Sequence, residues 1–385
     1  ILAVCNNRSL VPFLKTKIEL AYQQRAGEPL PENTVDVFYK NGLMWHLAQR
    51  GLWRYQQVDN GTDETRAQCY LSQLEGIRRD HPEIAESAFY DAIYVDEGQD
   101  FVEDDFRLLT ALCRVRDGSE PNLYIFYDDA QNFLGRPRPN WRSLGLNVVG
   151  GRAMVMSKCF RNTRPVVEAA FNVLYGTSGG TNAQVPTQQF SDVSWLKEKH
   201  LIVERDGFWH VHFAARDGHC APTLTVTPSK ESETKQVVDR LRWLIETERV
   251  RPQDILLLCY SNDRLREVKS HITRTITQSP ISGVTHLHDT SCQKDDILCK
   301  HDTVTLSTTA SAKGYDAYCV LLVSGNDFPS DVEGRINFYI GCTRAIEYLE
   351  VFAYRKERLV IELESVLAKQ KALTPNDAET SRSNQ

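Results

Sequence analysis

Short apolar segments alternate with longer segments of helical periodicity along most of the chain. Residues 1–5, 92–95 and 254–260 are runs of apolar, largely β-branched or leucine residues, typical of strands buried on both faces. Residues 231–247 instead place their apolar side chains on one face of a helix. Strands that alternate with helices in this way predict parallel sheets assembled from β-α-β units. We therefore expect an α/β fold.

The alternation occurs twice, which predicts two doubly wound domains. We place the first at residues 1–150 and the second, with small insertions, at 151–360, and expect a helix end and a disordered tail over 361–385. An Asp-Gly pair predicts a hairpin over 201–213. No periodicity is evident over 276–300, which we expect to be irregular. Further expected elements are strands over 123–127 and 153–156, a flexible excursion over 176–189, and helices over 104–116 and 335–346.

Acidic residues follow two of the predicted strands. The strand through Val95 continues into Asp96 and Glu97, and a second predicted buried strand, 123–127, continues into the sequence DDAQ at 128–131. Ligands of open α/β sheets bind beyond the carboxyl ends of the strands. Two adjacent carboxylates at that edge suit a magnesium–phosphate centre, in which one holds the metal and the other steers a water molecule. A solvated acidic loop is the alternative, but it needs no buried strand before it.

Composition and charge restrict the classes of function. The chain has 385 residues, 41% of them hydrophobic and 25% charged, which is typical of a globular protein, and it contains no apolar run long enough to span a membrane. The net charge of −6 requires any nucleic-acid binding to use a local groove. Ten cysteines without a CxxC pair favour reduced thiols and a cytoplasmic location. The spacing of the histidines and cysteines over 286–301 matches no zinc pattern that we can justify.

Five motifs follow one another in an order that resembles superfamily 1 DNA helicases of the UvrD/Rep type. They are Asp96–Asp100 (DEGQD), Asp128–Gln131 (DDAQ), Cys159–Thr163 (CFRNT), Ser311–Asp316 (SAKGYD) and Cys342–Ala345 (CTRA). The resemblance covers roughly residues 1–355 and is closest to the compact branch, whose members often carry a nuclease or another module in front. It implies two RecA-like domains of the P-loop NTPase fold that hydrolyse ATP between them with Mg²⁺. The implied partner is single-stranded DNA or a duplex/single-strand junction.

The resemblance assigns roles to individual residues. Asp96 resembles the aspartate that holds Mg²⁺, and Glu97 the general base that orients the attacking water. Gln131 matches the glutamine that links the γ-phosphate to the DNA-binding surface. Arg161 and Arg344 match the two arginines that bracket the γ-phosphate, where a guanidinium fork neutralises charge better than a lysine.

Further residues are assigned to the nucleotide and to DNA. Phe160 stands where the family stacks a tyrosine on adenine. Asp316 stands where the family has a glutamate near the ribose, and Gly314 is also assigned to nucleotide binding. The positions that resemble DNA-binding ones are Asn6, Asn7, Arg8, Phe38, Thr309 and Lys313. Thr309 and its neighbour depart from the usual histidine of this motif.

A phosphate-cradling Gly-Lys-Ser/Thr sequence is absent from the chain. In the family this loop precedes the strand that matches residues 1–5, so we expect a missing N-terminal piece. The alternative is that the loop has been lost and the protein no longer binds a nucleotide. The leading hypothesis is an ATP-dependent DNA helicase or translocase. The main alternative is a subunit that senses ATP or DNA and gates a partner nuclease or other effector without unwinding, and the weakest is a degenerate scaffold. We expect no membrane partner.

Overall fold

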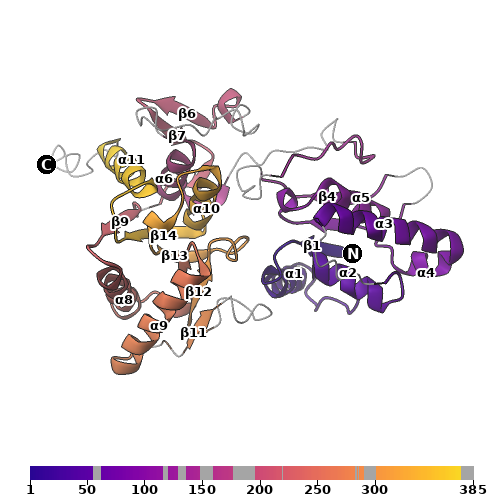
Figure 1. Cartoon of the computed structure of the whole chain (residues 1–385), viewed down its shortest axis with the longest axis horizontal. Helices are drawn as coiled ribbons and strands as arrows, with labels where there is room; N and C mark the ends of the chain where they lie inside the picture. The colour runs from indigo at the N-terminus through magenta and orange to yellow at the C-terminus, as the bar shows by residue number, and fades with distance from the viewer. Residues whose placement is uncertain are drawn as a thin grey trace. The chain divides into compact units, whose positions relative to one another are not determined.

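The computed structural model divides the chain into two compact units at residue 155, each with its own parallel sheet and hydrophobic core (Figure 1). The mixed α/β fold with parallel sheets is therefore confirmed. The residues that the structure describes are 1–54, 62–115, 120–128, 136–147, 159–176, 196–218, 220–281, 284, 286–289 and 301–373. The expected strand over 153–156 and the excursion over 176–189 lie outside the described residues, the latter apart from residue 176.

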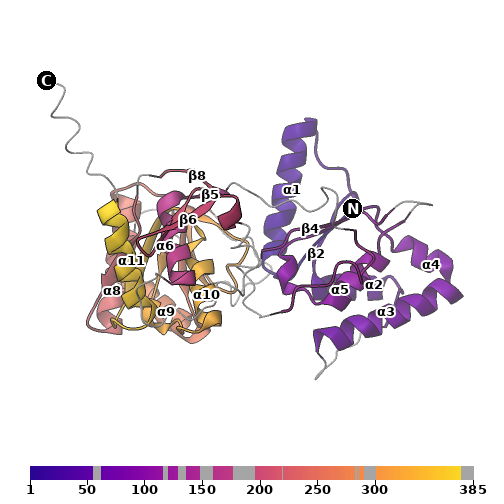
Figure 2. The ribbon, with the colours of Figure 1, turned by 90° about the horizontal axis from the view of Figure 1, so that it is seen from above.

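The first unit contains a four-stranded sheet in the order β2-β1-β3-β4, with every pair parallel. Its strands are β1 (Leu2–Cys5), β2 (Asp36–Tyr39), β3 (Ile93–Val95) and β4 (Leu123–Ile125). Its helices are α1 (Leu10–Ala26), α2 (Lys40–Gln49), α3 (Asp63–Asp80), α4 (Pro82–Ser87) and α5 (Glu103–Ala111). Figure 2 shows α1 on one side of the strands and α2, α3 and α5 on the other. Because β1 and β3 are in register, Leu2 and Val4 lie beside Ile93 and Val95 in the core under α2, α3 and α5.

Two expectations for this unit were wrong. The strand expected over 123–127 is shorter and is an edge strand, so it is not buried: Tyr124 and Phe126 are 50% and 55% exposed. Tyr124 instead stacks on Tyr94 of β3, with ring centroids 4.7 Å apart, on the face away from the main core. The helix expected over 104–116 ends at Ala111, because the chain then turns back and the Arg114 amide donates to the Tyr90 carbonyl.

The second unit contains a six-stranded parallel sheet in the order β11-β12-β10-β13-β14-β9. Its strands are β9 (Thr223–Val226), β10 (Ile255–Cys259), β11 (His286–Asp289), β12 (Thr303–Thr308), β13 (Ala317–Leu322) and β14 (Ala345–Ala353). Its helices are α6 (Arg164–Tyr175), α8 (Lys230–Glu246), α9 (Asn262–Gln278), α10 (Val332–Cys342) and α11 (Leu359–Leu373). One core lies under α6, α10 and α11 and another under α8 and α9, so the sheet is covered on both faces (Figure 1).

Smaller elements surround this sheet. Strands β5 (Cys159–Thr163) and β8 (Ala214–Arg216) pair with each other, and β6 (Ile202–Arg205) and β7 (Phe208–Val211) form the predicted hairpin. Asp206 and Gly207 at its tip both have positive φ, as a two-residue turn between twisted strands requires. Residues 276–300 were expected to be irregular, yet they include edge strand β11, which bonds to β12. Helix α10 ends before Thr343, so the expected helix over 335–346 was too long at its C-terminal end.

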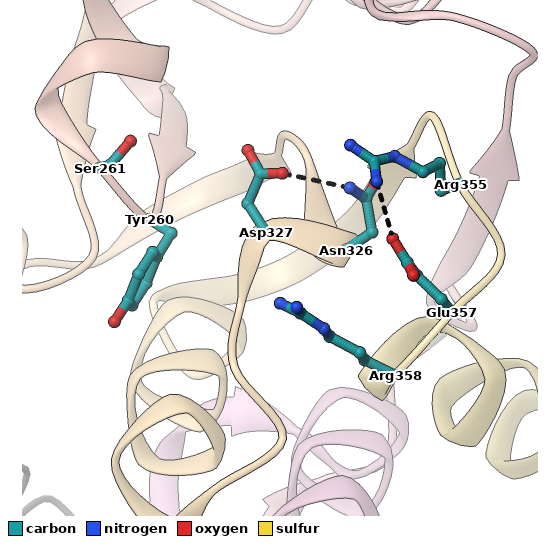
Figure 3. Close-up of a pocket in the computed structure, with 7 residues that line it drawn as sticks. All are labelled: Tyr260, Ser261, Asn326, Asp327, Arg355, Glu357 and Arg358. Carbon is teal, nitrogen blue, oxygen red and sulfur yellow. Dashed lines mark hydrogen bonds and ion pairs between the residues drawn. The ribbon is translucent and has the colours of Figure 1, made fainter.

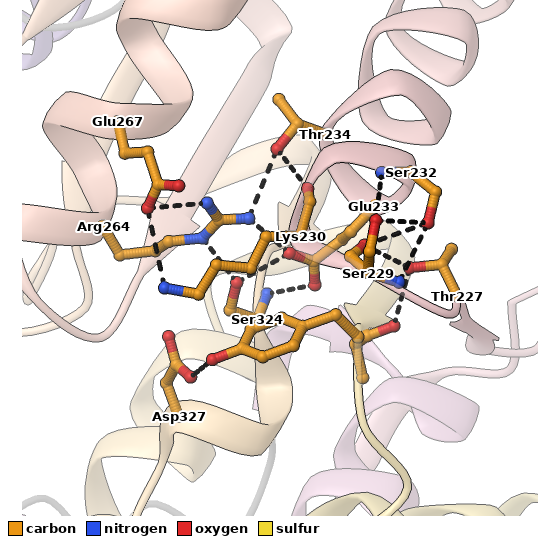
Figure 4. Close-up of polar contacts among 12 residues, drawn as sticks. Thr227, Ser229, Lys230, Ser232, Glu233, Thr234, Arg264, Glu267, Ser324 and Asp327 are labelled. Carbon is orange, nitrogen blue, oxygen red and sulfur yellow. Dashed lines mark hydrogen bonds and ion pairs between the residues drawn. The ribbon is translucent and has the colours of Figure 1, made fainter.

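A buried ion pair joins α8, α9 and the turn after β13 (Figure 4). Arg264 Nη2 lies 2.6 Å from Glu233 Oε2, and their side chains are 3% and 0% exposed. Ser324 donates to the same carboxylate from its amide and from its hydroxyl, at 2.9 and 2.7 Å. Burial raises the pKa of Glu233, and the hydrogen bonds from Ser324 and Arg264 oppose that rise. The carboxylate thus depends on its donors to stay in the core.

We predict that Arg264→Met destabilises the second unit by about 3–5 kcal/mol, because Glu233 then keeps a buried charge without its cation. Urea denaturation followed by circular dichroism measures the loss. The double variant with Glu233→Leu should recover much of it. Arg266→Met is the control, since Arg266 pairs with Asp263 at the exposed face of α9. Equal stability of Arg264→Met and Arg266→Met would contradict the assigned role of the pair.

Candidate functional site

The two acidic residues after β3 lie at the carboxyl edge of the first sheet. The Asp96 amide donates to the Val4 carbonyl of β1 at 2.9 Å, which extends the β1–β3 ladder to the tip of the strand. Cys5, at the end of β1, lies close enough to the acids for their negative charge to act on it. Burial first, and then the charges of Asp96 and Glu97, raise the pKa of its thiol. The sheet therefore brings both carboxylates to the edge where the sequence predicted a phosphate centre.

Glu97 occupies a backbone conformation that is unfavourable for its residue type. Its φ and ψ are 54° and 49°, in the left-handed region. For a residue other than glycine this costs of order 1 kcal/mol or more, and such positions concentrate at functional sites. The next residue, Gly98, has no room for a side chain, since an added Cβ would lie 2.7 Å from Cγ2 of Ile125. The Gly98 amide also donates to the Phe126 carbonyl at 2.7 Å, so the turn is fixed against β4.

Gln99 is a residue of this site to which the sequence analysis assigned no role. Its side chain is 1% exposed, its Nε2 donates to Glu97 Oε2 at 2.5 Å, and its Oε1 accepts from the Asp128 amide at 3.0 Å. It therefore connects the tips of β3 and β4. The available signal was the glutamine two residues after the glutamate in a tight turn, a spacing that lets the amide reach back to the carboxylate. Gln131, the glutamine that was assigned a role, lies outside the described residues.

Four DNA-binding candidates lie in the first unit: Asn6, Asn7 and Arg8 follow β1, and Phe38 is part of β2. Asn7 accepts hydrogen bonds from the amide and hydroxyl of Ser9 and so stabilises the start of α1. Arg8 lies over the ring of Tyr39, 5.6 Å from its centroid. The structure thus brings Asn6, Asn7 and Arg8 to the carboxyl edge that carries Asp96. Phe38 is half-buried, packs against the core and lies 4.6 Å from the His46 ring, so it is not an open stacking surface.

The second unit brings together Phe160, Arg161 and Asp316. Phe160 is 67% exposed, and Arg161 Nε lies 3.1 Å from Asp316 Oδ2. Asn162 donates to the carbonyls of Thr343 and Ala345, at 2.8 and 2.6 Å, which attaches β5 to the turn before β14. Sequence reasoning quoted Asn162 within its motif but gave it no role.

Arg344 is inside the second unit and not on its surface. It is 1% exposed, and its Nε and Nη1 donate to the carbonyls of Ile340 and Tyr315, at 3.0 and 3.1 Å. The guanidinium thereby joins the C-terminus of α10 to the loop that carries Asp316. Of the two arginines assigned to the γ-phosphate, Arg161 is exposed and Arg344 is buried.

The remaining candidates belong to the loop between β12 and β13. Thr309 and Lys313 are 0% and 2% exposed, and the Thr309 amide donates to the Cys259 carbonyl at 3.0 Å. Gly314 has a φ of 87°, a conformation that suits a glycine at the turn before Asp316. Both side chains are buried in this structure, so neither presents an exposed contact for DNA.

A polar pocket of about 260 Å³ lies at the carboxyl ends of β10, β13 and β14 in the second unit (Figure 3). It is lined by Tyr260, Ser261, Asn326, Asp327, Arg355, Glu357 and Arg358. The chain leaves β10 toward β11 and leaves β13 toward β14, in opposite directions along the sheet. The pocket therefore lies at a topological switch point, where open sheets bind ligands. None of the sequence motifs falls in it.

The described residues contain neither a cluster of metal ligands nor a membrane-spanning helix. Within the part of the chain that the structure describes, no three histidine, cysteine, aspartate or glutamate side chains are grouped to hold a metal. A magnesium ion held by one carboxylate, water and phosphate needs no such group, so Asp96 fits that role. Cys292 and Cys299 of the rejected zinc pattern lie outside the described residues. None of the described helices has the length and apolar character of a membrane span.

Comparisons with known proteins show a weak similarity to a solved structure. No protein-family model matches the chain, and no curated protein matches it. The C-terminal domain of a possible DNA helicase from Lactobacillus plantarum WCFS1 matches 54% of this chain and 96% of its own, with 15% identity and a TM-score of 0.35. So low a TM-score adds no weight to any assignment, which rests on the geometry described above.

We predict that Gly98→Val destabilises the first unit by about 1–3 kcal/mol, because the added side chain must push the turn away from β4. Thermal unfolding measures the change. Gly76→Ala is the matched control: Gly76 lies in α3 with open space around it, so alanine should stabilise the helix by up to ~1 kcal/mol. A Gly98→Val protein as stable as the wild type would contradict the close approach of the turn to β4.

Proposed function

We propose that this chain is the ATP-hydrolysing part of a superfamily 1 DNA helicase or translocase acting on single-stranded DNA. The observation that carries the proposal is the pair of carboxylates, Asp96 and Glu97, on a strained turn at the carboxyl edge of a parallel sheet. The order of the five motifs along the chain supports it. Neither feature alone specifies a motor, but a base and a metal ligand in this position suit nucleotide hydrolysis.

Each assigned residue has a distinct task in phosphoryl transfer, which is catalysed by positioning and by charge neutralisation. Asp96 would hold a magnesium ion, which would neutralise charge on the phosphate oxygens. The Glu97 carboxylate accepts a proton from the attacking water and fixes its direction. Arg161 is exposed and supplies a guanidinium for the γ-phosphate, and the exposed ring of Phe160 offers a face for the base. Arg344 holds the Asp316 loop in place through its hydrogen bond to the Tyr315 carbonyl.

We predict that Glu97→Gln lowers hydrolysis stimulated by single-stranded DNA by about 10²-fold or more, because the amide cannot accept the proton. Phosphate release measures hydrolysis, and a fluorescent ATP analogue measures binding, which should persist. The control is Glu83→Gln on the exposed face of α4, which should retain full activity. Hydrolysis that survives in Glu97→Gln would remove this residue from the role of base.

A second candidate is a subunit that senses ATP or DNA and gates a partner nuclease. The observation that favours it is the burial of Arg344, Thr309 and Lys313, three residues expected to contact phosphate or DNA. A chain whose contact residues face inward can respond to a ligand by a change of loop conformation without moving along DNA.

A strand-displacement assay separates the two candidates. The motor hypothesis predicts that a 3′- or 5′-tailed duplex is unwound in an ATP-dependent manner, and that Glu97→Gln abolishes unwinding. Hydrolysis that is stimulated by DNA while no strand is displaced, and no translocation is detected on single strands, would favour the sensor.

A further inference from the structure

The Gln99 side chain has a fixed orientation at the tip of β3. The backbone N–H of Asp128 can only donate a hydrogen bond, so the Gln99 atom 3.0 Å from it is the carbonyl oxygen Oε1. The amide nitrogen Nε2 must then face Glu97 Oε2, 2.5 Å away, to which it donates. The two hydrogen bonds therefore specify each other, and one amide group serves both strand tips.

The surroundings of Gln99 leave it little freedom. It lies in the short 3-10 turn Gly98–Asp100, whose first residue contacts β4 and whose last residue is 3% exposed. The turn begins at Glu97, whose backbone is in the left-handed region. A glutamate in this conformation has no regular secondary structure to fix its side chain, so a buried donor of fixed position can hold the carboxylate in one place.

We propose that Gln99 is the positioning residue for Glu97 and ties the position of that carboxylate to the tip of β4. It does not touch the reacting atoms. It holds the Glu97 carboxylate through the hydrogen bond to Oε2. Because Gln99 also holds the Asp128 amide, a displacement of Asp128 moves the general base. This inference rests on the proposed function, since it assigns Glu97 the role of base.

Two substitutions separate the two hydrogen bonds. Gln99→Glu keeps an oxygen that can accept from the Asp128 amide but removes the donor to Glu97 and places a second carboxylate beside it. Gln99→Met, of similar length, removes both hydrogen bonds. Gln68→Glu is the matched control, because Gln68 Nε2 donates to the carboxylate of Asp104 at 2.8 Å between α3 and α5, away from the strand tips.

The proposal predicts different results in two measurements. In Gln99→Glu, kcat for DNA-stimulated hydrolysis falls by about 10- to 100-fold, KM for ATP stays within about threefold, and hydrogen exchange at the Asp128 amide is unchanged. In Gln99→Met, kcat falls similarly and the Asp128 amide exchanges at least about tenfold faster. Gln68→Glu changes neither. If Gln99 had only a structural role, its substitution would instead lower the stability of the protein and weaken ATP binding, seen as a raised KM. It would not lower kcat selectively.

The outcomes also separate this inference from the proposed function. Wild-type kcat in Gln99→Glu, or unchanged Asp128 exchange in Gln99→Met, overturns the positioning role while the ATPase assignment stands. A wild-type chain that shows no hydrolysis with ATP and single-stranded DNA overturns the proposed function. The exchange measurement still reports on the bond from Gln99 to Asp128 in that case, and exchange that is unchanged in Gln99→Met would overturn the link between strand tips as well.

Discussion

The candidate site depends on the hydrogen-bonded alignment of β1, β3 and β4 at the carboxyl edge of their sheet. The Asp96 amide reaches Val4 on one side, and the Phe126 amide reaches Val95 on the other. These backbone bonds fix where β3 ends and therefore where the carboxylates begin. The left-handed Glu97 and the close contact of Gly98 with β4 follow from that end point, because the chain must turn sharply while it remains against its neighbour.

Much of the fold was predictable from the sequence. The alternation of strands and helices is a local pattern with a well-understood meaning, and it predicted two parallel α/β units. It also predicted that the residues after β3 and β4 share an edge, because parallel strands all end on the same side. The exposure of β4 was missed, because an apolar run such as 123–127 reads the same in the middle of a sheet and at its edge.

The burial and the distant contacts of individual side chains could not be predicted from the sequence. Lys313 and Arg344 are charged residues beside small ones, a context that suggests exposure, yet tertiary contacts bury both. Arg344 is buried where the carbonyls of Ile340 and Tyr315 accept its hydrogen bonds. The two carbonyls come together only after α10 and the loop before β13 have packed. Gln99 and Asn162 act through bonds to segments distant in sequence, so no local spacing fully reveals their partners.

The parallel sheet of the first unit also has a consequence for how the protein folds. Residue Leu2 pairs with Ile93, and Ile93 pairs with Leu123, so the acidic edge is complete only when segments far apart in the chain have met. Pairings of such long sequence separation are slow to form, because loop entropy is lost before the contacts are gained. Until then β3 and β4 lack the partner strands that they have in the folded sheet, and Tyr94 and Tyr124 are not stacked, so these strand edges are open to other chains. The strand pairings that complete the acidic edge are therefore also pairings whose delay exposes the chain to aggregation during synthesis.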